Sequence, residues 1–120
     1  MRLEIETAAH GNVTVVRCRG RIIYGVEADA LRERVNALLA ETPRIVFHLG
    51  GVRDMDSGGI GRVVGMVVSA RRAGGDIKFC GLSSKVHHAL QITGLLKVFD
   101  VFDSEEEAVR AFAGDLKASA

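Results

Sequence analysis

Short segments of the chain alternate hydrophobic and polar residues, which is the pattern of half-exposed β-strands. The alternation is clear from Leu3 to Thr7 and again from Asp76 to Cys80, and Val98 to Phe102 is predicted as the last strand. Gly11-Asn12 is a turn signal between the first segment and Val13–Cys18. The sequence therefore predicts a hairpin at one edge of a sheet, with further strands downstream.

Between these strands, apolar residues recur with the spacing of a helix that buries one face. The first helix is predicted from Val26 to Ala40, because the residue before Pro43 is pushed out of the α region. The continuous apolar run Ile45–Leu49 predicts a central strand that is covered on both faces. A second helix follows Ser57. The residues predicted to form its buried face are Ile60, Val63, Val64, Val67 and Val68.

Two further helices complete the pattern. Ser83 or Ser84 is expected to cap a third helix that ends at Gly94, and Ser104 with Glu107 forms a capping box for the last helix. Strands thus alternate with helices of suitable length. The chain is predicted to be a single α/β domain with a mostly parallel central sheet, an N-terminal edge hairpin and about four helices packed on the sheet. Residues 116–120 are expected to form a fraying tail.

Composition narrows the classes of function. The 120 residues are 48% hydrophobic and 26% charged, as in a globular domain, and the formal net charge of +1 favours neither nucleic acid nor a membrane surface as a partner. Cys18 and Cys80 lie in separate strand-like segments, so we expect buried, reduced thiols. The N-terminal residues carry acids where a signal peptide needs an apolar run, and no segment is long enough to span a membrane. A cytoplasmic location is expected.

The junction between the central strand and the second helix holds the densest cluster of candidate functional residues, Arg53-Asp54-Met55-Asp56-Ser57-Gly58-Gly59-Ile60-Gly61. Asp56 or Ser57 is the expected N-cap, because a short side-chain oxygen there accepts from the free N–H groups of the first turn. The sequence therefore predicts a hydroxyl at the positive end of a helix, where an anion is stabilised.

The junction Met55-Asp56-Ser57-Gly58-Gly59-Ile60-Gly61 resembles the D-S-S-G-L-G motif of STAS domains, the anti-sigma factor antagonists of bacteria. The resemblance extends over residues 13–112, and its later landmarks are Gly74-Gly75-Asp76, Thr93-Gly94-Leu95 and Ser104-Glu105-Glu106-Glu107-Ala108. This chain departs from the family pattern at two positions. Gly58 replaces the second serine of the motif, and Tyr24-Gly25 stands in a loop that often holds an aspartate.

The resemblance implies a binding module without catalytic activity, metal or cofactor of its own. Ser57 is then the residue that a partner serine kinase, itself an anti-sigma factor, phosphorylates, and a phosphatase reverses the modification. The expected partner-binding residues are Met55, Asp56, Ser57, Gly58 and Gly59. ATP and Mg²⁺ belong to the kinase. An alternative is a STAS module of another assembly, such as a lipid-transport system or a stressosome-like complex.

Other chemistry fits the residues less well. Asp56-Ser57-Gly58-Gly59 also resembles the segment around the nucleophile of trypsin-like proteases, but no histidine shows the arrangement that a serine nucleophile needs, so a small serine hydrolase is the less favoured alternative. His87 and His88 are adjacent and cannot ligate one metal from the same helix. Asp54 lacks the clustered acids of a receiver-type magnesium site.

Overall fold

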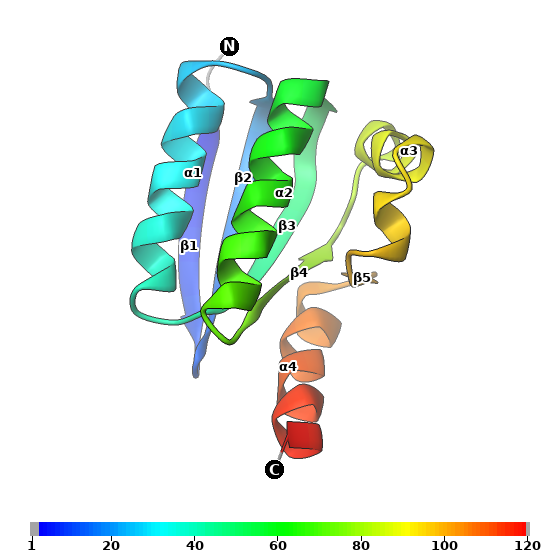
Figure 1. Ribbon diagram of the computed structural model, residues 1–120. Helices are drawn as coiled ribbons and strands as arrows, with labels where there is room; N and C mark the ends of the chain where they lie inside the picture. Colours follow the sequence, from blue (N-terminus) through cyan, green and yellow to red (C-terminus); the bar gives the residue numbers. More distant parts are fainter. Residues whose placement is uncertain (1–2, 120) are drawn as a thin grey trace.

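The strands lie side by side in the order in which they occur in the chain, and the computed structural model describes residues 3–119. The elements are β1 (Glu4–His10), β2 (Val13–Ile22), α1 (Val26–Leu39), β3 (Arg44–Met55), α2 (Ser57–Arg72), β4 (Asp76–Cys80), α3 (Ser84–Ile92), the short 3-10 helix η1 (Leu95–Lys97), β5 (Val101–Phe102) and α4 (Glu105–Ser119). Only β1 and β2 are antiparallel; the other neighbours are parallel. The predicted α/β fold with an edge hairpin is confirmed (Figure 1).

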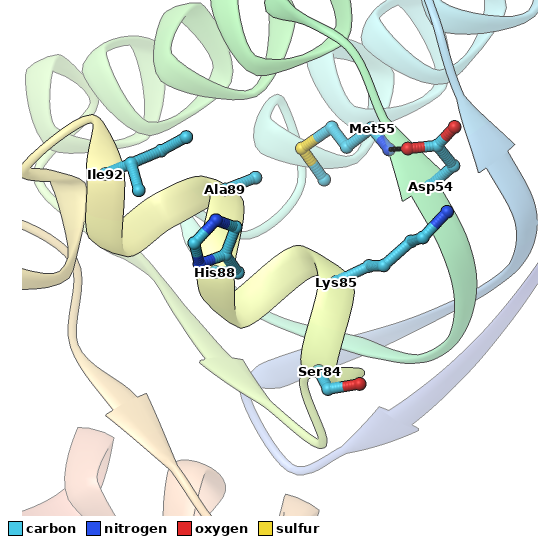
Figure 2. A pocket seen from close by; sticks show the side chains of 7 residues that line it. All are labelled: Asp54, Met55, Ser84, Lys85, His88, Ala89 and Ile92. Atoms are coloured by element: carbon cyan, nitrogen blue, oxygen red, sulfur yellow. Dashed lines mark hydrogen bonds between the residues drawn. The ribbon is translucent and has the colours of Figure 1, made fainter.

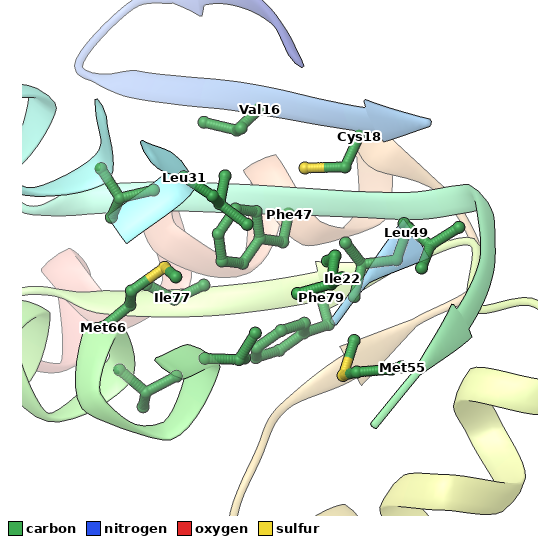
Figure 3. Packing of buried hydrophobic residues seen from close by; sticks show 14 of the residues in the cluster. Val16, Cys18, Ile22, Leu31, Phe47, Leu49, Met55, Met66, Ile77 and Phe79 are labelled. Carbon is green, nitrogen blue, oxygen red and sulfur yellow. The ribbon is translucent and has the colours of Figure 1, made fainter. Parts of the chain in front are cut away.

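Successive residues of the central strands point to opposite faces of the sheet, as strand geometry requires. On β3, Ile45, Phe47 and Leu49 join the larger apolar cluster, which residues of α1, α2 and α3 complete. Figure 3 shows part of this cluster, including Phe47 of β3, Leu31 of α1 and Met66 of α2. Val46 lies between Ile45 and Phe47 in sequence and joins a smaller cluster with Phe112 of α4. The predicted central strand is therefore buried on both faces, and β3 carries the chain through the middle of the domain to the junction.

Each cysteine lies in one of these two clusters, and neither forms a disulfide. Burial raises the pKa of the Cys18 thiol to about 12 and that of the Cys80 thiol to about 11. Both groups are thus protonated near neutral pH and behave as small apolar side chains. The prediction of buried thiols is confirmed.

The buried face of α2 differs from the predicted one. Val63 and Val67 are buried as expected, but Val68 is 42% exposed. The buried residues of the helix are Gly59, Val63, Met66, Val67 and Ala70, while Ile60 and Val64 are only partly buried. At 100° per residue, the observed face is rotated by roughly a quarter turn from the predicted one. The rotation follows from Gly59, which has to face β2.

The last strand is shorter than predicted. Residues 98–102 were expected to be extended, but β5 contains only Val101 and Phe102, which pair with Phe79 and Cys80 of β4. The preceding residues form η1, because Gly94 takes a left-handed conformation at φ 76° and Phe99 donates to the carbonyl of Leu95 at 2.9 Å. This turn buries Phe99 although the residue does not belong to a strand.

An ion pair joins α4 to the sheet. Arg17 of β2 donates from Nε to Glu105 Oε2 at 2.6 Å and from Nη2 to Glu105 Oε1 at 2.9 Å. These hydrogen bonds hold the pKa of Glu105 below its usual value. Glu105 is the first residue of α4, and the helix is capped by Ser104, whose Oγ accepts from the N–H of Glu107 at 3.2 Å. The predicted N-terminus of this helix is confirmed.

Candidate functional site

The strand-to-helix junction is a sharp turn made by a single residue, Asp56. β3 ends at Met55, α2 begins at Ser57, and Asp56 between them is extended at φ −90° and ψ 177°. The Asp56 carboxylate accepts from the N–H of Gly59 at 2.7 Å, and the Asp56 carbonyl accepts from Ile60 at 2.9 Å. Of the two N-caps that the sequence allowed, the structure selects Asp56. Ser57 therefore takes the first helical position with its hydroxyl free of any capping role.

The same carboxylate ties the junction to the loop between β2 and α1. Both Asp56 oxygens accept from the backbone N–H of Tyr24, at 2.9 and 3.1 Å. One side chain thus fixes two segments that lie more than thirty positions apart in the chain. Hydrogen bonds to an ionised group are stronger than those between neutral groups, so this acid determines where the loop lies relative to the helix.

Gly59 is a position where only glycine fits. A Cβ atom built on it would lie 1.9 Å from the carbonyl oxygen of Ile22 and 2.7 Å from the carbonyl carbon. Both are backbone atoms and cannot rotate away. The first turn of α2 is therefore in direct backbone contact with the end of β2, and this contact sets the rotation of the helix.

Gly58 is also in close contact, but with a side chain. A Cβ at this position would lie 2.5 Å from Tyr24 Cβ, 2.9 Å from Cδ1 and 3.0 Å from Cγ. The aromatic ring thus covers the glycine. The ring itself is open to solvent, since Tyr24 is 70% exposed.

Arg62, one turn further along α2, also lies near the ring. Its guanidinium carbon is 5.8 Å from the Tyr24 ring centroid, within cation–π range. Arg62 Nε also donates to Asp29 Oδ1 of α1 at 2.6 Å, and this hydrogen bond raises the pKa of Arg62. The hydrogen bond to Asp29 therefore fixes Arg62 beside the Tyr24 ring.

Ser57 is the exposed residue of the junction. Its hydroxyl forms no hydrogen bond to any residue that the structure describes, and the first turn of α2 carries no acidic residue. Asp56 is exposed and Gly58 half-buried, whereas Gly59 is buried and Met55 is 6% exposed. The structure thus brings the five predicted site residues into one turn. Asp56 and Ser57 face solvent, the Tyr24 ring covers Gly58, and Met55 and Gly59 lie below the surface.

A shallow pocket of about 400 Å³ opens beside this turn, between the end of β3 and α3 (Figure 2). The side chain of Met55 extends from the strand end toward Ala89 and Ile92 of α3, and these three residues line the apolar part of the pocket. Lys85 and His88 bring polar groups to its rim. Asp54 on the opposite side accepts from the N–H of Met55 at 2.9 Å. The pocket extends the surface from the end of β3 to α3, and Ser57 is not among the residues that line it.

The arrangement gives little support to catalysis. No histidine forms a hydrogen bond to Ser57 in the part of the chain that the structure describes. Across the described residues, no group of three or more histidine, cysteine, aspartate or glutamate side chains could hold a metal ion. What the site offers is an exposed hydroxyl at a helix N-terminus, surrounded by fixed groups.

Comparison with known families agrees with this geometry. The family model for the STAS domain matches residues 4–108, from the start of β1 into α4. The chain belongs to the STAS domain family. Among its relatives, the STAS domain is 29% identical over 111 residues to an anti-sigma F factor antagonist of Paenibacillus polymyxa, covering 91% of this chain and 94% of that protein. It is also 29% identical over 111 residues to an anti-sigma-B factor antagonist of Bacillus subtilis, covering 92% and 100%.

Solved structures support the fold. The anti-sigma factor antagonist SpoIIAA in its unphosphorylated form superposes with a TM-score of 0.78 at 22% identity, covering 92% of this STAS domain and 97% of that chain. The phosphorylated form of SpoIIAA from Bacillus superposes with a TM-score of 0.69 at 20% identity, covering 91% and 97%. Within residues 3–119 of this STAS domain, no helix has the length and apolar character needed to cross a bilayer.

Tyr24 and Arg62 are the site residues that sequence reasoning missed. Tyr24 was recognised as a departure from the family pattern, but its contact with Gly58 joins segments far apart in the sequence. Arg62 lies within the second helix, where a charged residue is usually a solvated surface group. A signal was present nonetheless, because the two departures from the motif occur together in this STAS domain.

Proposed function

We propose that this STAS domain is an anti-sigma factor antagonist that a partner serine kinase switches off by phosphorylating Ser57. The observation that carries the proposal is the free hydroxyl of Ser57 at the first position of α2, exposed and relieved of capping by Asp56. The names of the relatives from Paenibacillus polymyxa and Bacillus subtilis support the antagonist role. The domain acts in the cytoplasm, where sigma factors bind RNA polymerase.

Phosphorylation is compatible with the folded domain. A phosphate adds about −1.5 to −2 charges at the positive end of the α2 dipole, where negative charge is stabilised. Ser57 is exposed, so the phosphate needs no cavity. The nearest competing charge is Asp56, whose oxygens are already paired with the N–H groups of Tyr24 and Gly59. We therefore expect the modified domain to keep its fold.

The effect of the phosphate falls on the partner. Unmodified Ser57 is exposed, and it lies beside Gly58 and the Tyr24 ring that covers this glycine. After modification, the same surface carries a doubly charged, strongly hydrated group, and burying it in an interface without a matching cation is unfavourable. The anti-sigma factor kinase, which supplies ATP and Mg²⁺, is released from the antagonist, and a phosphatase restores the hydroxyl. The STAS domain itself contributes no catalytic group.

The proposal is tested with the anti-sigma factor serine kinases of the source cell, purified singly and incubated with the domain, ATP and Mg²⁺. Mass spectrometry should locate one phosphate on Ser57. Ser84 is the matched internal control, because it is also an exposed serine at the first position of a helix, after the N-cap Ser83. Absence of phosphate on Ser57 with every kinase, or equal modification of Ser84, contradicts the proposal.

Calorimetry with the kinase then separates modification from binding. Ser57→Ala should bind like the parent and resist phosphorylation. Ser57→Asp should keep the fold and bind at least about tenfold more weakly, although one carboxylate carries less charge than a phosphate. Ser84→Ala should match the parent in both assays. Equal affinity of Ser57→Asp and the parent would identify a STAS domain that does not switch.

A further inference from the structure

The two positions at which this chain departs from the motif of its family touch each other. Gly58 stands where the motif has a second serine, and Tyr24 stands in the loop that often has an aspartate. A Cβ on residue 58 would lie 2.5 Å from Tyr24 Cβ, closer than real Cβ contacts occur. Any residue with a Cβ at position 24 in this conformation, tyrosine included, therefore excludes a side chain at position 58.

The clash cannot be relieved by rotating the tyrosine. Rotation about χ1 moves the ring carbons Cγ and Cδ1 but leaves Cβ where it is, and Cβ is the closest atom. The loop backbone would have to shift instead, and that backbone is fixed by the hydrogen bonds from the Tyr24 N–H to Asp56. A serine at position 58 thus displaces the loop beside Ser57 as well as the ring.

The tyrosine is presented like an anchor of a protein interface. Its ring is 70% exposed, and it is held by Gly58 below, by Arg62 at 5.8 Å and by the backbone hydrogen bonds to Asp56. Tyrosine and arginine are enriched among the residues that dominate binding energy, and a side chain fixed before binding loses less entropy on association. Gly58 is adjacent to Ser57, so the ring lies on the residue next to the hydroxyl that the kinase has to reach.

From this contact we infer that Tyr24, seated on Gly58, is the specificity-determining residue by which the partner kinase recognises this domain. The inference rests on the proposed function of Ser57. It goes further in naming the contact, an aromatic ring with an adjacent arginine, and in making the glycine a requirement of that contact. The partner kinase of this domain has a surface that accepts the ring. Domains with serine at the second motif position lack the glycine on which the ring packs.

The contact between Tyr24 and Gly58 is tested first, without any partner. Tyr24 is the only tyrosine and the chain has no tryptophan, so intrinsic tyrosine fluorescence reports on this one ring. Gly58→Ser should change the emission intensity and the acrylamide quenching of Tyr24. Gly65→Ser is the matched control, since residue 65 lies in the same helix with nothing within 4 Å of its Cβ position. Identical quenching of Gly58→Ser and the parent would overturn the inference.

Recognition is tested next by a double-mutant cycle with the purified kinase that phosphorylates Ser57. Tyr24→Ala should lower the affinity and the kcat/KM for Ser57 phosphorylation by about 30-fold, the size expected of an interface anchor. Gly58→Ser should lower both by about tenfold or more. The double variant should lose less than the product of the two single losses, because Gly58→Ser already displaces the ring that Tyr24→Ala removes. Val68→Ala, at an exposed position further along α2, should change neither.

The outcomes separate this inference from the proposed function. If no kinase phosphorylates the parent at Ser57, the proposed function fails and the inference fails with it. If the parent is phosphorylated but Tyr24→Ala is processed within about threefold of it, the inference alone is wrong. Tyr24→Phe keeps the ring on Gly58, so it should retain parental affinity, and circular dichroism should show that all variants are folded.

Discussion

Gly59→Ala is the substitution that tests most directly how α2 is placed in this domain. By helix propensity alone, alanine should stabilise the helix relative to glycine. The structure predicts the opposite, because the added Cβ would lie 1.9 Å from the carbonyl oxygen of Ile22. Real Cβ contacts are essentially never shorter than 3.0 Å, so the helix and strand would have to separate by at least about 1 Å.

The magnitude follows from what has to move. Forcing an extra carbon into a packed site costs about 1–3 kcal/mol. Shifting the first turn also weakens the Asp56 cap, which is worth about 1 kcal/mol. Against this, alanine gains less than about 1 kcal/mol in propensity at the end of a helix. We expect a net loss of about 2–3 kcal/mol, or a Tm lower by roughly 10 °C for a domain of this size.

Gly65→Ala is the matched control in the same helix. Nothing lies within 4 Å of a Cβ at position 65, and the residue is exposed. The same change should therefore stabilise the domain by about 0.5–1 kcal/mol and raise Tm by a few degrees. Thermal and urea denaturation followed by circular dichroism would measure both variants. A Gly59→Ala protein as stable as Gly65→Ala would refute the close contact between α2 and β2.

Further predictions concern the core, the α4 ion pair and the thiols. Val63→Asp should lower the free energy of unfolding by about 3–5 kcal/mol, because it buries an unpaired carboxylate. Val68→Asp on the exposed face should change the free energy of unfolding by less than about 0.5 kcal/mol. Similar losses for the two variants in urea denaturation would contradict the observed face of α2. The pKa of Glu105 is lowered in the folded state, so its stabilising effect is full above the ordinary glutamate pKa of about 4.3 and is lost as pH falls through the folded value. Glu105→Gln should thus be less stable at pH 7 and lose less stability on acidification, as urea titrations from pH 7 to pH 3 would reveal. At pH 8 the buried thiols, with pKa values of about 12 and about 11, should react with a disulfide reagent only after unfolding, and rapid labelling of the native protein would show that the core opens.

Local signals in the sequence were sufficient for most of the fold. The continuous apolar run at 45–49 identified the central strand, and Asp56 or Ser57 before the two glycines identified the start of the next helix. The face of α2 was harder, because its many valines are compatible with more than one rotation. The close contact between Gly59 and Ile22 decides that Met66 is buried and Val68 is exposed. That contact joins segments that are far apart in the sequence.

The candidate site was predictable where it depends on adjacent residues and unpredictable where it depends on contacts between distant segments. Ser57 and its helix position follow from adjacent residues, so they could be found from the motif. The role of Asp56 in holding Tyr24 could not, because nothing in the spacing of two residues so far apart specifies a hydrogen bond between them. The same holds for Gly58, which the motif identified only as an expected partner-binding residue. In the structure, its missing side chain makes room for a ring of the same chain.

The consecutive order of the strands also bears on how the domain assembles during synthesis. Each strand pairs with the one made just before it, so a chain emerging from its N-terminus can extend the sheet at one edge. The segments that build the junction, from Ile22 to the end of α2, are complete before α3 and α4 have been made. Val15 and Val46, however, stay uncovered on the second face until Phe112 arrives. A nascent chain that stalls before α4 therefore displays a finished strand-to-helix junction together with an open apolar face, which is the type of surface that chaperones bind.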